Sequence, residues 1–338
     1  KIGDDLRQRL RELEPHLRRE KEELAVTPAA AEALESLGDA SAEFVRSVRW
    51  KANLERLEAA RAADDAPLPA LQVTLRDYQQ AGFRWMNRLA TWGLGACLAD
   101  DMGLGKTLQA LAIIAARASN GPQLVIAPTS VVYNWVREAQ KFTPDLDFRL
   151  YIGGDRAGLL DDVGPQTVVV TSYGLVVRDI ETLRELSFTT VVLDEAQAIK
   201  NAQSQRSIAV RQLRADWRLA LSGTPVENHL GELWSLFDAL APGLLGSWSS
   251  FRDRFVAPIE RDGNRERAEA LSRLLRPFIL RRTKREVAKS CPPAPRSIST
   301  SCSPTPSAKH TIKPAPRPSR SCPAHRPTVE DVSRPSLR

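Results

Sequence analysis

The sequence predicts an α/β fold in which helices cover a doubly wound parallel sheet. Six short apolar runs carry this prediction, because they are rich in valine, isoleucine and leucine and do not alternate with polar residues. Such runs are typical of parallel strands that are buried on both faces. Segments of helical character separate them, which implies right-handed crossover connections. The predicted strands span residues 95–99, 124–127, 148–152, 167–171, 191–193 and 219–221.

Length and composition agree with this fold. A chain of 338 residues with 42% apolar residues can bury a proper core and could hold two domains. Nothing in it resembles a signal peptide or a membrane span, so we expect a cytoplasmic protein with no membrane partner. The net charge of +7 says little about the core, since residues 291–338 carry eight Lys and Arg against two acidic residues. The chain begins at Lys1 rather than Met, which suggests a fragment.

Residues 1–66 are predicted to form a helical region upstream of the sheet. In residues 4–24 leucines recur at intervals of four, three and four, which indicates an amphipathic helix that Pro15 kinks or divides. Residues 41–63 form a second predicted helix. The acidic, proline-containing segment 64–69 is typical of a linker and leads into the region 67–289.

Segment 98–109 has the composition of a phosphate-binding loop. Gly103 and Gly105 permit backbone conformations in which successive N–H groups point inward. Lys106 can reach the outer phosphates of a nucleotide, and the Thr107 hydroxyl can bind Mg²⁺. The residues that follow form helix readily, so the positive end of a helix dipole would face the anion. Asp100 stands where the general pattern has a glycine, and GKT sequences arise by chance, so the prediction needs support from its context.

A carboxylate pair at the end of another predicted strand supplies that support. Asp194 and Glu195 follow the apolar run 191–193, and the carboxyl ends of parallel strands meet at one edge of a sheet. An aspartate there can hold Mg²⁺, and the adjacent glutamate can orient and polarise an attacking water. The alternative is that the two acids are solvated and merely end a strand. The phosphate loop earlier in the chain makes this alternative less favoured.

These residues resemble the Swi/Snf-type ATPases of helicase superfamily two, in particular the bacterial members, from about residue 75 to residue 289. The resemblance implies a RecA-like first motor lobe over residues 67–289 that binds ATP and Mg²⁺. The family's own phosphate loop also has aspartate at the position of Asp100. Segment 75–79 looks like the adenine-reading Q motif, in which Gln79 would hydrogen-bond the base. The resemblance implies nucleotide contacts from Arg76, Gln79, Asp101, Met102, Gly103, Leu104, Gly105, Lys106 and Thr107.

Two further segments are similar to family motifs that face one DNA strand. Residues 125–135 resemble motif Ia, and residues 170–174 resemble motif Ib. Hydroxyl and backbone N–H groups at strand ends bind phosphates without reading bases. Taken without the family, such hydroxyls are more typical of helix caps and turns. The DNA-facing residues implied by the resemblance are Thr129, Ser130, Asn134, Thr171 and Ser172.

The resemblance also assigns the chemical roles. Residues 194–201 are similar to the DEAQ variant of motif II. Lys106 would hold the β and γ phosphates, Thr107 and Asp194 the metal, and Glu195 the water. The catalytic set implied by the family is Lys106, Glu195 and Gln197.

Motif III and the end of the lobe complete the resemblance. Residues 221–228 resemble motif III, in which Ser222 and Thr224 would couple nucleotide state to the DNA-facing surface, with Gln197 as the link from motif II. Segment 276–287 looks like the passage from the first lobe to a second. Its basic residues either contact DNA or the phosphate-facing cleft, or form a solvated helix surface.

Residues 290–338 are predicted to be disordered. From residue 291 onward the sequence holds eleven of the 23 prolines and no aromatic residue, which leaves too little apolar surface to offset ordering entropy. Family members continue into a second RecA-like lobe, which this segment does not match. We hypothesise that it is out-of-frame sequence, with a basic DNA-binding tail as the rival; translation of the other reading frames distinguishes them. Cys322 and His325 have no matching half for a metal site.

The leading hypothesis is the ATP-binding lobe of a DNA-dependent ATPase or translocase. It would act on double-stranded DNA through sequence-independent phosphate contacts, in a bacterial, nucleoid-associated setting, and could displace a protein from DNA. Arginine fingers from a second lobe are worth on the order of 10³ to 10⁵ in rate, so we expect slow hydrolysis from this chain alone. The alternatives are a nucleotide-binding or interaction module without catalysis and, less favoured, an RNA helicase.

Overall fold

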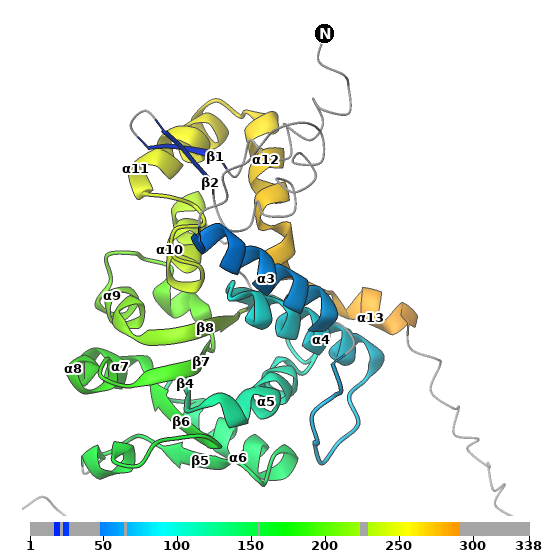
Figure 1. Cartoon of the computed structure of the whole chain (residues 1–338), viewed down its shortest axis with the longest axis vertical. Coiled ribbons are helices and arrows are strands. Elements are labelled where there is room, and N and C mark those ends of the chain that lie inside the picture. The colour runs from blue at the N-terminus through cyan, green and yellow to red at the C-terminus, as the bar shows by residue number, and fades with distance from the viewer. Residues whose placement is uncertain are drawn as a thin grey trace, which may run out of the picture. The chain divides into compact units, whose positions relative to one another are not determined.

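The computed structural model describes residues 17–20, 23–26, 48–63, 66–154, 156–223 and 229–290 (Figure 1). The predictions for residues 4–16, for residues 41–47 and for the tail from residue 291 fall outside these ranges. So does Thr224, one of the two residues predicted to couple motif III to DNA.

A seven-stranded sheet forms the centre of the described chain, and every pairing in it is parallel. The spatial order is β5-β6-β4-β7-β8-β3-β9. All six predicted runs are confirmed as strands of this sheet. The strands are β3 (Ala96–Leu98), β4 (Gln123–Ala127), β5 (Asp147–Leu150), β6 (Thr167–Ser172), β7 (Ser187–Leu193), β8 (Arg214–Leu221) and β9 (Ile279–Leu280).

Neighbouring residues of the central strands point into two separate cores. In β4, Val125 belongs to one hydrophobic cluster, whereas Leu124 and Ile126 belong to the other. Both faces of the strand are therefore apolar, which is why its sequence does not alternate. The edge strand β5 departs from this pattern, because its residues are half-buried or exposed. The expectation that every strand is buried on both faces is wrong for β5.

Helices cover both faces of the sheet (Figure 1). α4, α5 and α6 supply the first cluster through residues such as Phe83, Leu111 and Trp135, and α7, α8 and α9 supply the second. These helices span α4 (Asp77–Trp92), α5 (Lys106–Arg117), α6 (Val132–Phe142), α7 (Tyr173–Arg178), α8 (Ile180–Leu183) and α9 (Gln205–Gln212). Short 3-10 turns cover Ala118–Asn120, Ala157–Leu160 and Ala196–Ile199.

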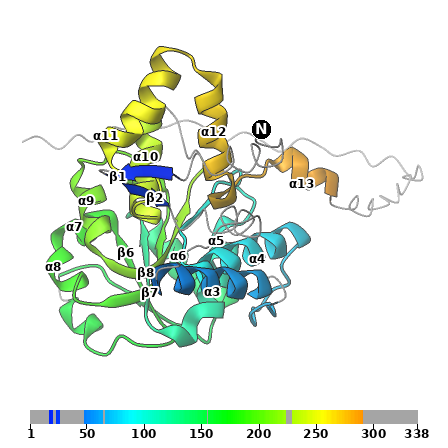
Figure 2. The ribbon, with the colours of Figure 1, turned by 45° about the horizontal axis from the view of Figure 1, so that its top comes forward.

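A further group of helices follows the last central strand and extends the first core. Phe251, Phe255, Leu271 and Leu274 from this group belong to the same cluster as the sheet residues. Figure 2 shows α11 and α12 together at one end of the lobe. The elements are α10 (Leu230–Leu240), α11 (Trp248–Phe251), a π-helix (Arg252–Arg261), α12 (Arg265–Leu275), a 3-10 turn (Arg276–Phe278) and, after β9, α13 (Lys284–Ser290).

The region upstream of the sheet is only partly helical. α3 (Val48–Ala62) confirms the second predicted helix and lies alongside α4 in both views (Figures 1 and 2). Leu54 and Leu57 pack there against Trp92. The helix predicted over residues 4–24 is wrong at residues 17–20 and 23–24, because β1 (Leu17–Glu20) and β2 (Glu23–Val26) form an antiparallel pair. Cross-strand hydrogen bonding replaces the helical bonds that the leucine spacing favoured.

Candidate nucleotide site

The sheet order brings the predicted nucleotide-binding segments to one edge. The phosphate loop follows β3, the acidic pair follows β7, and Ser222 follows β8, which lies between these two strands. All three strands run in the same direction, so their carboxyl ends meet. Burial raises the pKa of the Asp194 carboxyl, and Lys106 lies close enough for its positive charge to oppose that rise. The structure therefore brings the lysine-bearing loop and the acidic pair together.

The loop between β3 and α5 depends on two glycines in the left-handed region. Gly103 has φ +85° and Gly105 has φ +74°, and α5 begins immediately afterwards at Lys106. A Cβ on Gly105 would lie 2.6 Å from Gln79 Nε2, which excludes any side chain there without movement of Gln79. The glycines thus set the loop's conformation as predicted.

Lys106 and Thr107 lie in the first turn of α5. Lys106 Nζ donates to the carbonyl oxygen of Asp100 at 2.6 Å, so the ammonium group bonds the loop's own backbone. Within the described part of the chain, the Thr107 hydroxyl makes no hydrogen bond and remains available to a ligand. Met102, at the tip of the loop, is 71% exposed and lies beside Gly223 of motif III.

Asp194 accepts three hydrogen bonds, from an indole N–H, a backbone N–H and a phenol hydroxyl. Its Oδ2 accepts from Trp135 Nε1 at 2.8 Å and its Oδ1 from the Glu195 N–H at 2.9 Å, while its carbonyl accepts from the Tyr173 hydroxyl. Burial raises the pKa of the Asp194 carboxyl, and the two hydrogen bonds and Lys106 oppose that rise. Glu195 has φ +47°, a strained conformation for a residue with a Cβ.

Gln197 connects motif II to motif III. Its Nε2 donates to Glu195 Oε2 at 2.6 Å, and its Oε1 accepts from the Ser222 hydroxyl at 3.4 Å. Ser222 is also fixed by its backbone N–H, which donates to Leu98 O at the end of β3. A continuous polar chain therefore runs from the acidic pair to the end of β8.

The Q-motif glutamine contacts the phosphate loop. Gln79 is buried, its Oε1 accepts from the Arg76 N–H at 3.0 Å, and its Nε2 donates to Leu104 O at 3.4 Å. The Tyr78 hydroxyl donates to the same carbonyl at 3.0 Å. The Arg76 side chain is exposed. Hydrogen bonds to the carbonyl oxygen of Leu104 thus connect the start of α4 with the phosphate loop.

The residues predicted to face DNA separate into two groups. Thr129 and Ser130 are exposed directly after β4, where a phosphate could reach them. Asn134 is half-buried, and its side chain is paired within α6, with Glu138 and Arg137.

Thr171 and Ser172 require a correction. Thr171 is fully buried, and its hydroxyl donates to Tyr151 O at 2.9 Å. Ser172 is 5% exposed, and its Oγ accepts from the Leu175 N–H as the N-cap of α7. Neither hydroxyl faces solvent, because β6 is an inner strand and its end starts a helix. The helix-cap interpretation therefore holds for Ser172.

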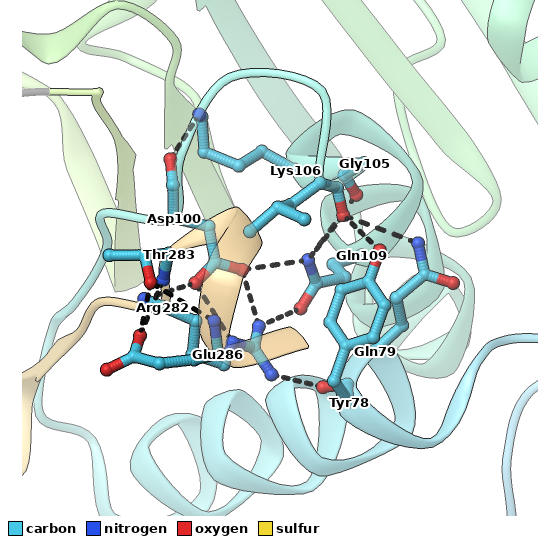
Figure 3. A network of polar contacts seen from close by, with 10 residues as sticks. Tyr78, Gln79, Asp100, Gly105, Lys106, Gln109, Arg282, Thr283 and Glu286 are labelled. Carbon is cyan, nitrogen blue, oxygen red and sulfur yellow. Dashed lines mark hydrogen bonds and ion pairs between the residues drawn. The ribbon is translucent and has the colours of Figure 1, made fainter. Parts of the chain in front are cut away.

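Several residues of the site are absent from the sequence-based set. Trp135 and Tyr173 lie within the two motif segments, but no pattern indicated that their polar atoms reach Asp194. Gln109 and Arg282 are further examples. They join Asp100 in the network of Figure 3, to which Arg282 is contributed by the C-terminal end of the lobe's sequence.

The donor set fits Mg²⁺ bound together with a nucleotide. Magnesium is usually held by one or two carboxylates and by substrate phosphates rather than by a dedicated protein cage. Asp194 offers one such carboxylate, and Thr107 offers a hydroxyl. No cluster of three or more His, Cys, Asp or Glu suited to a metal occurs among the described residues. In that same part of the chain, no helix is both long enough and apolar enough to cross a bilayer.

Fold and site together define the class of protein. A parallel sheet with a phosphate loop after one strand and an acidic pair after a near neighbour, at the same edge, is a RecA-like nucleotide-binding lobe. A family model described as SNF2-related domain matches residues 78–312. The chain belongs to this family.

Individual relatives agree with this assignment. The chain is 46% identical over 264 residues to YwqA of Bacillus subtilis, which carries the provisional name ATP-dependent helicase/translocase; the match covers 75% of this chain and 28% of YwqA. It is 38% identical over 237 residues to the ISWI chromatin-remodeling complex ATPase CHR17 of Arabidopsis thaliana, covering 68% and 22% of the two chains. The chain thus spans well under half the length of these relatives.

A solved structure gives the same fold. The Sulfolobus solfataricus SWI2/SNF2 ATPase core, determined in complex with double-stranded DNA, superposes with a TM-score of 0.61 and 42% sequence identity. The match covers 66% of this chain and 47% of that one. The fold was predicted from the apolar runs and the family from the sequence motifs, and both are confirmed.

Proposed function

We propose that this chain contains the ATP-binding motor lobe of a DNA-stimulated ATPase that translocates on duplex DNA, with the lobe over residues 67–289. The convergence of β3, β7 and β8 at one edge carries the proposal, because it places Lys106 and Asp194 within electrostatic reach and joins Glu195 to Ser222 through Gln197.

Each residue near the edge has a role suited to its chemistry. Lys106 would leave Asp100 O and hold the β and γ phosphates, and the N–H groups of residues 103–107 would bind phosphate oxygens. Thr107 and Asp194 would hold Mg²⁺, which, when bound, neutralises charge on the transferred phosphoryl group. Glu195 would orient the attacking water, with Gln197 fixing its carboxylate.

DNA contact is proposed at the exposed end of β4. The Thr129 and Ser130 hydroxyls lie there without burial and could bind phosphates of one strand regardless of sequence. The solved Sulfolobus core was determined with double-stranded DNA, which supports DNA as the polymer. RNA is the alternative, and competition between the two polymers at stated salt concentrations distinguishes them.

The test is steady-state ATP hydrolysis with and without duplex DNA, on the wild-type chain and on two variants. Lys106→Ala should abolish nucleotide binding or turnover, because it removes the ammonium group that would hold the β and γ phosphates. Glu195→Gln should bind ATP yet stop hydrolysis, since an amide cannot polarise water. Undiminished turnover in Lys106→Ala refutes the assignment.

A nucleotide-binding module with little catalysis is the second candidate. One observation favours it: the described residues contain one seven-stranded sheet, whereas catalysis in this architecture takes arginines from a second lobe. Stimulation of hydrolysis by DNA in this chain would favour the motor function. Saturable ATP binding without stimulated turnover would favour the module.

A further inference from the structure

Arg282 joins the end of the lobe to the phosphate loop (Figure 3). It follows β9, yet its Nε donates to Asp100 Oδ1 at 2.9 Å and its Nη2 forms an ion pair with the same carboxylate. Nη2 also donates to Gln109 Oε1 at 2.7 Å, and Nη1 donates to the carbonyl of Tyr78. One guanidinium thus contacts the start of α4, the start of the loop and the helix after it.

Backbone hydrogen bonds reinforce this junction on both sides of Asp100. The N–H of Ala99 donates to Leu280 O at 2.7 Å, and the N–H of Asp101 donates to Arg282 O at 3.0 Å. In return the N–H of Arg282 donates to Asp100 Oδ1 and the N–H of Lys284 to Asp101 Oδ2, both at 3.0 Å. The exit segment, residues 280–284, is therefore bonded to the entry of the phosphate loop at every second residue, through Leu280, Arg282 and Lys284.

The network continues to the residues that set the loop's shape. Gln109 Nε2 donates to Asp100 Oδ2 at 3.2 Å and also reaches Leu104 O, the carbonyl that accepts from the Tyr78 hydroxyl. Leu104 immediately precedes Gly105, whose left-handed conformation starts the nucleotide-binding helix. A shift of Arg282 would therefore disturb Asp100, Gln109 and the loop between them.

Burial makes this contact obligatory. Asp100 is 0% exposed, and a buried carboxylate is tolerated only when it is paired and hydrogen-bonded. The Arg282 side chain, at 16% exposed, is the ion-pair partner found for it. A glycine, the residue of the general loop pattern at this position, could make none of these side-chain contacts. The departure at position 100 therefore has a structural explanation.

We infer that Arg282 is a positioning residue for the phosphate loop, and that docking of the exit segment and nucleotide binding stabilise one another through its contact with Asp100. This inference rests on the proposed function. Coupling between two sites is reciprocal. If docking of the exit segment raises nucleotide affinity by some factor, bound nucleotide therefore favours docking by the same factor. α13 starts directly afterwards, with Thr283 and Glu286 capping each other, so a displacement of Arg282 would move the helix that leaves the lobe.

Affinity measurements on two neighbouring arginines test the positioning role. Arg282→Gln should weaken binding of a fluorescent ATP analogue with Mg²⁺ by about tenfold, within the usual range of coupling between sites. Arg281→Gln is the matched control, because Arg281 is exposed, and it should bind as the wild type does. Arg282→Lys keeps the charge without the planar fork and should recover part of the loss. Equal affinity of Arg282→Gln and wild type would overturn the inference.

Amide hydrogen exchange on the wild-type chain tests the coupling without any substitution, even if Arg282→Gln does not fold. With Mg²⁺ and a slowly hydrolysed ATP analogue, exchange should slow at residues 103–107 and also at the N–H groups of Arg282 and Lys284. Slower exchange in the loop alone would overturn the inference and leave the proposed function standing. Unchanged exchange at both places would overturn both. In Asp100→Asn the response of the exit segment should be lost while residues 103–107 still respond.

Discussion

Removal of the indole N–H that holds Asp194 should shift the pH at which magnesium-nucleotide binding fails. Trp135→Phe deletes the N–H group that donates to Asp194 Oδ2. Burial raises the pKa of the Asp194 carboxyl, and this hydrogen bond opposes the rise. Hydrogen bonds to charged groups are worth about 1.5–3 kcal/mol, and one pKa unit corresponds to about 1.4 kcal/mol. Loss of this hydrogen bond should therefore raise the pKa of Asp194 still further above its usual range.

The sign of the effect follows from the proposed role of Asp194 as an ionised metal ligand. Because the carboxylate must be charged to hold Mg²⁺, binding disappears as the pH falls through the pKa, and the variant should lose binding at a higher pH than the wild type. The assay is titration with a fluorescent ATP analogue and Mg²⁺ from pH 8 downward, with protein folding monitored by circular dichroism.

Trp217→Phe is the matched control for this experiment. Trp217 is 2% exposed, and its Nε1 donates at 2.8 Å to Leu94 O, a neutral carbonyl away from the acidic pair. Its replacement removes the same atoms from the same core cluster and should leave the pH profile unchanged. Identical profiles for Trp135→Phe and Trp217→Phe would refute the assignment of Asp194 as the pH-sensitive metal ligand.

Two further predictions concern the loop and the strand before it. Gly105→Ala should weaken ATP-analogue binding more than Gly103→Ala, because both pay about 1–2 kcal/mol for a left-handed conformation but only position 105 forces Gln79 to move. Equal effects in the same titration would contradict that reasoning. Burial raises the pKa of Cys97 from 9.0 to about 12, so this thiol should resist iodoacetamide at pH 8 in the native protein and react in urea, as read by peptide mass spectrometry. Because the pKa of Cys97 is higher in the folded chain than in the unfolded chain, the protonated thiol contributes fully to stability below pH 9, and this contribution is lost as the pH rises toward 12. Alkylation of Cys97 in the native state would contradict its burial.

The central sheet could be predicted from sequence because its signal is local. Each inner strand has apolar residues on both faces, as Leu124, Val125 and Ile126 show, and a continuous apolar run is the direct consequence. β9 escaped prediction because Ile279–Leu280 is only two residues long and exists through its pairing with β3. The hairpin of β1 and β2 likewise depends on pairing that leucine spacing does not encode.

The site shows the same division between local and distant information. Gly103, Gly105 and the acidic pair stand out because their chemistry is tied to short spacing. Trp135 reaches Asp194, 59 positions away, and Arg282 reaches Asp100 across 182 positions, which only the folded chain reveals. The Thr171 hydroxyl matched a family motif, but its position inside β6 turns it toward Tyr151 O rather than toward solvent.

The most direct test of the account is an experimental structure of the chain with Mg²⁺ and a non-hydrolysable ATP analogue. We predict that Lys106 Nζ leaves the carbonyl of Asp100 for the β and γ phosphates, with the metal between the Thr107 hydroxyl and the Asp194 carboxylate. A triphosphate bound away from the loop, or a metal that Asp194 does not approach, would contradict the account.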